Sequence, residues 1–192
     1  MRHVEYEPDP PEVPERAPGA RGAGGPISEE ERLQKALDLA YAYLNARDRT
    51  VSEVRQRLQR RGVSDEVSEN VIGIIGEQGF LDDTRFARLF VADKRTLEQW
   101  GSERIRRGLL SRGIDRHLVD AALAEEADSA GDDDGVGGSL SELDRALALL
   151  RRRFPQPPKD RRDRNRALGM LLRKGYESEL ALDALAAYAR GE

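Results

Sequence analysis

The sequence predicts an all-α protein in which three tandem three-helix repeats form an elongated array that can be curved. Hydrophobic residues make up 38% of the 192 residues and charged residues 35%, a balance that suits thin helices with wide solvated faces. One helix-to-helix junction, each time centred on a glycine, recurs at Gly62, Gly113 and Gly175. The recurrence predicts one structural unit used three times.

The chain opens with a segment that we expect to be a disordered tail. Residues 1–27 are rich in Pro, Gly and Glu, and they bury too little apolar surface to offset the entropy of ordering. The first helix is predicted to start at Ser28, because Ser28 and Glu31 form a capping box in front of apolar residues spaced along one face. It opens the first repeat, residues 28–81.

Two further helices complete this first repeat. Thr50 and Glu53 form a second capping box, and Gly62 stands just after the predicted end of that helix, where a left-handed residue is favoured. Ser64 is expected to cap the third helix, which ends near the turn at Gly79.

Alignment of the chain on the three glycines brings six neighbouring positions into register. Each junction also follows a predicted helix, at about residues 28–47, 82–98 and 140–153, so the unit has three helices and the array nine. The aligned positions lie 8, 4 and 1 residues before and 1, 5 and 10 after each glycine: Val54, Leu58, Arg61, Val63, Val67 and Ile72; Ile105, Leu109, Arg112, Ile114, Leu118 and Leu123; Ala167, Leu171, Lys174, Tyr176, Leu180 and Leu185.

The second and third repeats are predicted over residues 82–126 and 140–192. Between them, residues 127–139 have the composition of an acidic Gly/Asp linker. The net charge of -4 hides a strong segregation, since residues 1–31 carry -5 and residues 125–142 carry -7. The remainder is a basic helical body of +8 with two acidic, flexible segments, which permits an anionic partner.

A family resemblance rests on the run Gly-Phe-Leu-Asp-Asp-Thr-Arg-Phe-Ala at residues 79–87, followed by Arg112-Gly113-Ile114. These residues resemble the core signature of the RecX regulatory proteins. The resemblance covers about residues 33–124 and reaches the third unit through Arg173-Lys174-Gly175-Tyr176. It implies a protein that binds the RecA recombinase as monomer and filament and lodges along the groove of the DNA filament. It further implies suppression of strand exchange, ATP hydrolysis and co-protease activity, and thus negative regulation of recombination and the SOS response. Independently of the resemblance, the chain has no apolar N-terminal region and no membrane-spanning stretch, so we expect it to be cytoplasmic.

The signature also has a structural interpretation. Asp82 is expected to cap the helix that follows, Asp83 to favour the positive end of its dipole, and Leu81 to meet Phe86 as a hydrophobic staple. The signature therefore identifies the family without marking a functional site. The residues assigned a structural role are Phe80, Leu81, Asp82, Asp83, Phe86, Gly62, Gly113 and Gly175.

Basic residues on the second helix of each repeat are the candidates for contact with RecA or the filament, since a groove lined by phosphates rewards exposed arginine. Those next to the glycines have a structural alternative, because a helix C-terminus favours positive charge. The candidates are Arg55, Arg57, Arg60, Arg61, Arg104, Arg106, Arg107, Arg112, Arg164, Arg166, Arg173 and Lys174.

Aromatic residues and one arginine run leave alternatives open. Phe86, Phe90 and Trp100 could stack on bases, but aromatic residues at helical spacing usually pack in a core. The run Arg151–Arg153 either ends a helix with favourable charge or contacts DNA.

Catalysis and cofactor binding are not expected. The chain has no cysteine and two histidines, His3 in the tail and His117 on a predicted surface, so no set of titratable groups converges. Asp132–Asp134 lack the alternating ligands of a calcium loop. No stretch is long and apolar enough to span a membrane, and we expect a monomer with neither metal nor cofactor.

The sequence therefore predicts a non-enzymatic regulator that acts through RecA, with DNA bound weakly or through the filament. The rival hypothesis is an autonomous DNA-binding helical-repeat module whose basic helices act on DNA directly. A generic helical scaffold is a third possibility.

Overall fold

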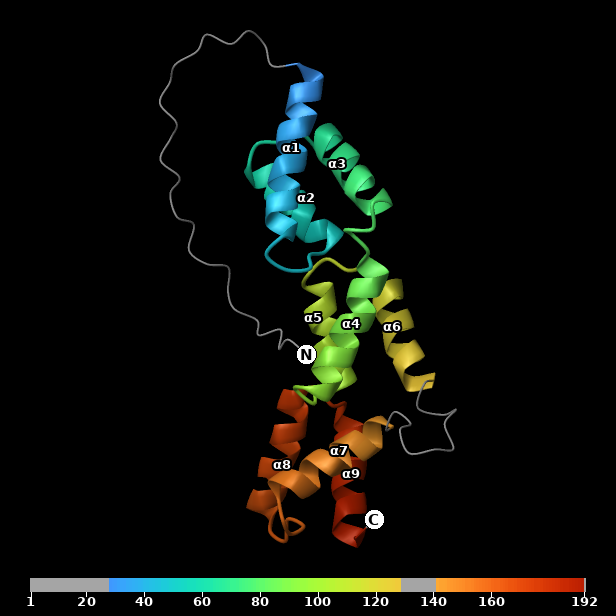
Figure 1. Ribbon diagram of the computed structural model, residues 1–192. Coiled ribbons are helices and arrows are strands. Elements are labelled where there is room, and N and C mark those ends of the chain that lie inside the picture. The colour runs from blue at the N-terminus through green and yellow to red at the C-terminus, as the bar shows by residue number, and fades with distance from the viewer. Residues whose placement is uncertain (1–27, 129–140, 192) are drawn as a thin grey trace.

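The computed structural model describes residues 28–128 and 141–191, and these residues form nine helices and no β-strand. The helices fall into three consecutive groups, called here repeat 1 (α1–α3), repeat 2 (α4–α6) and repeat 3 (α7–α9), which follow one another along one long axis (Figure 1). The predicted fold class is confirmed. The helices are α1 (Glu29–Leu44), α2 (Val51–Arg60), α3 (Asp65–Glu77), α4 (Asp83–Thr96), α5 (Ser102–Leu110), α6 (Arg116–Asp128), α7 (Glu142–Arg153), α8 (Arg161–Lys174) and α9 (Ser178–Arg190).

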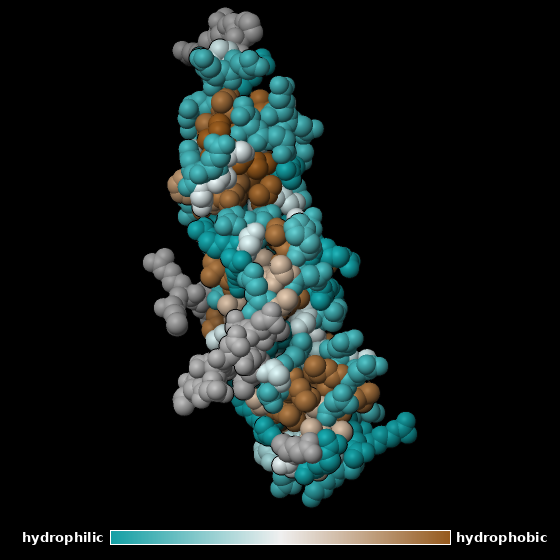
Figure 2. All heavy atoms as spheres, turned by 90° about the vertical axis from the view of Figure 1, so that its right-hand side faces the viewer, coloured by the Kyte–Doolittle hydropathy of each residue, from teal (hydrophilic) through white to brown (hydrophobic). Residues whose placement is uncertain are grey.

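Each repeat has a hydrophobic core of its own. Repeat 1 buries Ala36, Val54 and Ile75 in one cluster, and repeats 2 and 3 form two further clusters from the corresponding helices. Patches of apolar side chains therefore alternate with hydrophilic bands along the molecule (Figure 2). Because the cores are separate, the repeats must be held together mainly by other contacts, which lie at the two seams.

Side chains expected to start helices do so. Ser28 accepts a hydrogen bond from the Glu31 N–H at 3.2 Å, and Asp82 accepts one from the Arg85 N–H at 2.9 Å. Thr50 and Glu53 form the predicted capping box in both directions. Ser64 caps α3 as expected. Capping thus fixes the helix boundaries locally, as the sequence indicates.

The repeated junction is the same structure three times. Gly62, Gly113 and Gly175 have φ of 76°, 76° and 89°, in the left-handed region that favours glycine. The N–H of the residue after each glycine donates to the carbonyl of the leucine four residues before that glycine, at 3.1, 3.2 and 3.1 Å. Each second helix therefore ends in a Schellman motif, and the leucine carrying that carbonyl is fully buried.

These junctions also join the repeats. At the first seam, the Arg112–Gly113 junction of repeat 2 lies on the N-terminus of α2, where the Thr50 hydroxyl donates to the Arg112 carbonyl at 2.8 Å. A Cβ on Gly113 would lie 2.3 Å from the Ser52 Oγ. Two features therefore require glycine at position 113: its positive φ and the close approach of α2.

The second seam repeats this arrangement with main-chain bonds. The Gly101 N–H donates to the Lys174 carbonyl at 2.8 Å, and the Glu103 N–H donates to the Gly175 carbonyl at 3.1 Å. A Cβ on Gly101 would lie 2.3 Å from the Gly175 carbonyl oxygen. The backbone N–H groups at the start of α5, which have no partner within that helix, are thus satisfied by the carbonyls at the C-terminal end of α8.

A charged cluster reinforces the second seam. The buried guanidinium of Arg95 lies 3.4 Å from carboxylate oxygens of both Glu126 and Glu142, and Arg145 pairs with Glu126. Glu142 also accepts the Ser102 N–H at 2.7 Å. Burial alone would raise the pKa of Glu142, but the bonds from Ser102 and the charge of Arg95 outweigh it and lower that pKa.

The acidic segment predicted at residues 125–142 needs correction at its ends. Glu125, Glu126 and Glu142 belong to helices and pair with arginines, Glu125 with Arg88 at 2.6 Å. Glu126 and Glu142 therefore belong to the second seam, and Glu125 forms an exposed ion pair instead of lying in a free acidic segment. The remainder of the predicted linker, like the predicted tail at residues 1–27, lies outside the described residues, except for the end of α6.

The signature residues differ in part from expectation. Leu81 packs into the core of repeat 1 and Phe86 against that of repeat 2, so each serves the core of its own repeat, and their contact as a staple stays a prediction. Asp83 accepts the Val51 N–H at 3.0 Å, so it caps α2 across the seam, and burial raises its pKa. Phe80 is 56% exposed and lies edge-on to Tyr41.

The two contexts of the repeated glycine give a matched test. A Cβ on Gly62 would meet open space, with nothing within 4 Å, whereas one on Gly113 would meet Ser52. Gly62→Ala should lower the free energy of unfolding by about 1–2 kcal/mol, the cost of a left-handed alanine. Gly113→Ala should lose about 1–3 kcal/mol more through overpacking. Urea denaturation measures both, and Ser52→Gly should recover part of the Gly113→Ala loss in a double-mutant cycle. Equal losses at the two glycines would contradict close packing at the seam.

The charged cluster predicts an acid-sensitive contribution to stability. Glu142→Gln should lower the free energy of unfolding by about 1–2 kcal/mol at neutral pH, because a charge-assisted pair is lost. Since the folded-state pKa of Glu142 lies below its ordinary value of 4.5, the advantage of the natural chain is complete above that value. It should vanish as the pH falls through the lowered pKa. Urea midpoints of both chains between pH 7 and pH 3 check this, and a difference that persists in acid would contradict it.

Candidate functional site

The register of the repeats defines one face shared by the three second helices. Four positions, lying 9, 6, 5 and 2 residues before each repeat glycine, share one side of each helix at helical spacing. We call this surface the second-helix face. Its members are Glu53, Gln56, Arg57 and Arg60 on α2; Arg104, Arg107, Gly108 and Ser111 on α5; and Arg166, Gly169, Met170 and Arg173 on α8.

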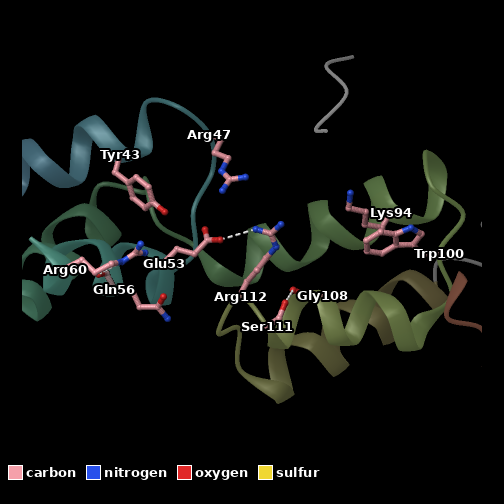
Figure 3. Close-up of a pocket in the computed structure, with 10 residues that line it drawn as sticks. All are labelled: Tyr43, Arg47, Glu53, Gln56, Arg60, Lys94, Trp100, Gly108, Ser111 and Arg112. Atoms are coloured by element: carbon pink, nitrogen blue, oxygen red, sulfur yellow. Dashed lines mark hydrogen bonds and ion pairs between the residues drawn. The ribbon is translucent and has the colours of Figure 1, made fainter. Parts of the chain in front are cut away.

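At the first seam the second-helix face lines a groove of about 380 Å³. Figure 3 shows its parts: side chains of repeat 1 lie at one end, Arg112 crosses towards Glu53 in the middle, and Lys94 and Trp100 lie at the other end. Four of the lining residues are basic and one is acidic, so the groove is electropositive. The lining residues are Tyr43, Arg47, Glu53, Gln56, Arg60, Lys94, Trp100, Gly108, Ser111 and Arg112.

The aromatic rings of this groove are covered by cations. The guanidinium of Arg49 lies 3.9 Å from the Tyr43 ring centre, and that of Arg104 lies 4.1 Å from the Trp100 ring centre. Trp100 also meets Phe90 edge-on, with ring centres 6.3 Å apart. Packing with cation–π contact therefore accounts for Trp100, and base stacking is not needed to explain it.

Several predicted arginines are neutralised within their own repeat. Arg55 pairs with Glu69 at 2.6 Å, and Arg106 pairs with Asp120. Both pairs join the positions seven residues before and seven after the glycine, so repeats 1 and 2 share one ion pair. The hydrogen bond to Arg55 lowers the pKa of the Glu69 carboxyl. Repeat 3 has Leu168 and Leu182 at these positions.

Three other candidates build the seams. Arg112 pairs with Glu53 at 3.0 Å, and Arg104 donates to the Arg173 carbonyl at 3.0 Å. The Lys174 ammonium donates to the Glu98 carbonyl at 2.7 Å. Burial lowers the pKa of Lys174, and the neighbouring charge of Arg104 lowers it further. For these residues the structure supplies a structural role that is independent of any partner.

The remaining candidates are closer to solvent. Arg57 is partly buried, with its guanidinium 5.6 Å from the Tyr43 ring centre. Exposed positions are held by Arg60, Arg61, Arg107, Arg164, Arg166 and Arg173. Arg60 and Arg107 each donate from Nε to the carbonyl four residues earlier on their own helix. The other guanidinium nitrogens of these two residues give the second-helix face donors for an anionic partner.

Sequence reasoning missed basic residues contributed by the first helices. Arg47 and Lys94 line the first groove although neither was among the candidates. Arg152 and Arg153, for which DNA contact was only one alternative, line a second groove in repeat 3. All four stand near the end of the first helix of their repeat, where a basic residue is ordinarily read as a complement to the helix dipole.

The described residues show no site for metal-assisted chemistry or a membrane span. No group of three His, Asp or Glu side chains in residues 28–128 and 141–191 could hold a metal ion. His117 is exposed, and its ring lies 2.6 Å from Asp115 on its own turn. None of the described helices has the length and apolar character needed to cross a bilayer.

Comparison with known proteins identifies the repeats. Models for the first, second and third three-helix domains of RecX match residues 36–73, 82–123 and 141–185. A regulatory protein RecX from Mycobacterium avium (strain 104) is 33% identical over 168 residues, covering 86% of this chain and 91% of that protein. The chain belongs to the RecX family. The resemblance of the signature residues to RecX is thereby confirmed. The relatives that match bear the name regulatory protein RecX.

Other RecX proteins agree in sequence and fold. The regulatory protein RecX of Amycolatopsis mediterranei (strain U-32) is 31% identical over 159 residues, covering 79% of this chain and 82% of that one. The crystal structure of RecX from Lactobacillus salivarius superposes with a TM-score of 0.69 at 19% identity, covering 85% of this chain and 99% of that chain. A second RecX crystal structure gives a TM-score of 0.62 at 21% identity. The three-repeat RecX fold is therefore shared.

The different surroundings of Arg112, at the first seam, and Arg107, at an exposed position, predict different effects of their substitution on stability. Arg112→Gln should lower the free energy of unfolding by about 1–2 kcal/mol, because it leaves the Glu53 carboxylate, 19% exposed, without its charged partner. Arg107→Gln, at an exposed position of the neighbouring turn, should change it by less than about 0.5 kcal/mol. Chemical denaturation of the two variants measures the contrast. Similar losses in both would show that Arg112 is not a seam residue.

Proposed function

We propose that this RecX protein binds the RecA recombinase and its DNA filament and lowers ATP hydrolysis, strand exchange and co-protease activity. Family membership supports a regulatory role. The structural observation that supports the mechanism is the second-helix face, which repeats along the array and carries exposed cations. By this proposal the protein is a negative regulator of recombination and the SOS response, and it performs no chemistry itself.

The shape and charge of the array suit a long, repeating partner. The seams join the second helices end to end, so equivalent positions recur along one axis. A filament presents equivalent surfaces at intervals along its own axis, and several weak contacts on one rigid body add in avidity. The array would bridge neighbouring recombinase subunits and hinder the movements that turnover requires.

The seam residues narrow the contact surface. Arg55 and Arg106 are paired within their repeats, while Arg104, Arg112 and Lys174 hold the seams. The contact is therefore assigned to the exposed cations of the second-helix face, Arg60, Arg107, Arg166 and Arg173. Electrostatic contacts of this kind are sensitive to salt.

The direct experiment is a titration of RecA ATPase on single-stranded DNA with the full chain. The rate of ATP hydrolysis should fall as the protein is added, and the protein should sediment with RecA filaments. A flat ATPase response together with no sedimentation would overturn the proposed function and leave the fold untouched.

The exposed cations can be tested without disturbing the seams. Arg60→Glu combined with Arg107→Glu should weaken inhibition of RecA by about tenfold or more, since two charges are reversed in the contact. Arg32→Glu combined with Arg116→Glu is the matched control, because both arginines are exposed and lie off the second-helix face. The protein concentration at half-inhibition is measured for both, with circular dichroism to check helicity. Equal weakening would show that overall charge matters and the face does not.

A further inference from the structure

Repeat 3 contains a groove of about 750 Å³ whose charged lining residues are all arginines. Arg152 and Arg153 come from the end of α7, and Arg166 and Arg173 come from the second-helix face of α8. Phe154 and Met170 supply apolar surface between them. The groove has the same construction as the groove at the first seam: the end of a first helix faces the second helix of the array.

The floor of this groove is fixed by the core. Phe154 and Met170 both pack against the hydrophobic cluster of repeat 3, and the Phe154 carbonyl accepts a hydrogen bond from the Tyr188 hydroxyl. Gly169 lies within α8, where glycine is unfavourable relative to alanine, yet a Cβ there would come 3.2 Å from the Arg173 Nη1. The glycine leaves room for the Arg173 side chain to lie along the helix.

The four guanidinium groups of the groove have no acidic partner in the described part of the chain. Among residues 28–128 and 141–191, none of the four forms an ion pair, whereas repeats 1 and 2 pair Arg55 with Glu69 and Arg106 with Asp120. The stretch 151–174 holds ten basic residues and two acidic ones, and Asp160 caps the start of α8. The positive charges of Arg152 and Arg153 contribute to lowering the pKa of Lys174 at the seam. Like charges kept together in this way are unfavourable unless an anion binds between them.

We propose that the arginine groove of repeat 3 binds the phosphodiester backbone of a nucleic-acid strand. Its side chains offer many hydrogen-bond donors, and Gln156 is the one lining side chain with a strong acceptor. A phosphodiester offers only acceptors at neutral pH, and guanidinium groups bind it in a two-pronged manner. An acidic peptide carries backbone N–H donors as well as acceptors, and among the lining side chains the Gln156 amide oxygen is the one strong acceptor for them, so nucleic acid is the better fit. Phe154 and Met170 would contact the sugar or an unstacked base.

This site needs no recombinase. Arg166 and Arg173 also belong to the proposed RecA contact, but oligonucleotide binding is measured without RecA, so the two proposals can be tested separately. Binding is measured by fluorescence anisotropy of a labelled oligothymidylate of about 16 nucleotides, a length within the range of single-strand sites. The full chain is used without RecA.

The test variant is Arg166→Gln combined with Arg173→Gln. The dissociation constant for the oligonucleotide should rise at least tenfold. The slope of log affinity against log salt should become shallower by about 1.4, since each phosphate contact on a single strand contributes about 0.7. The control is Arg161→Gln combined with Arg164→Gln, which removes the same charge from exposed positions of the same helix outside the groove. The control should bind within twofold of the natural chain.

Three results would overturn the proposal. They are no salt-sensitive binding by the natural chain, equal loss in the control, and displacement of the oligonucleotide by a glutamate oligopeptide of equal charge as effectively as by unlabelled oligonucleotide. Loss of RecA inhibition has no bearing on these measurements. Conversely, a chain that binds the oligonucleotide but leaves RecA ATPase unchanged would refute the proposed function and keep this site.

Discussion

The structure depends on one joint, in which the C-terminal end of a second helix lies on the N-terminus of the second helix before it. Helix ends leave backbone N–H and carbonyl groups unpaired, and the joint at the second seam pairs them with each other, as at Gly101 and Lys174. The approach is so close that Gly113 and Gly175 tolerate no Cβ. Separate three-helix units thereby become one array, and the positions facing a partner acquire a common register.

The two seams share one geometry but use different bonds. The first relies on side chains, with the Thr50 hydroxyl on the Arg112 carbonyl and the Arg112 guanidinium on Glu53. The second adds main-chain bonds and the charged cluster around Arg95. That cluster also ties α6 to α7, which the chain joins through its Asp-rich segment. Because Glu142 belongs to this cluster and its pKa is lowered, the union of repeats 2 and 3 weakens when acid protonates that carboxylate.

Electrostatics separates the arginines into those that serve the fold and those left for a partner. In repeats 1 and 2 one arginine of the second helix forms an ion pair with the third helix, and other arginines form contacts at the seams. Repeat 3 has Leu168 and Leu182 in place of that ion pair, and Arg166 and Arg173 of its second helix line the groove. In the part of the chain that the structure describes, the four groove arginines of repeat 3 have no ion-pair partner, which favours an anionic partner there.

The helices, their caps and the register shared by the three repeats could be predicted from the amino-acid sequence, because they follow from local rules. These rules place serine, threonine and aspartate at helix starts, and glycine where φ must be positive. The amino-acid sequence also placed the chain among the RecX proteins through residues 79–87. Which arginines are available to a partner depends instead on how the repeats pack. Arg112 and Arg107 look alike in sequence, yet one pairs with Glu53 from another repeat and the other is exposed. Packing likewise places Lys94, Arg152 and Arg153 in the linings of the two grooves. Ion pairs and grooves form between residues far apart in the chain, so their partners are set by how the repeats pack, which local pattern does not specify.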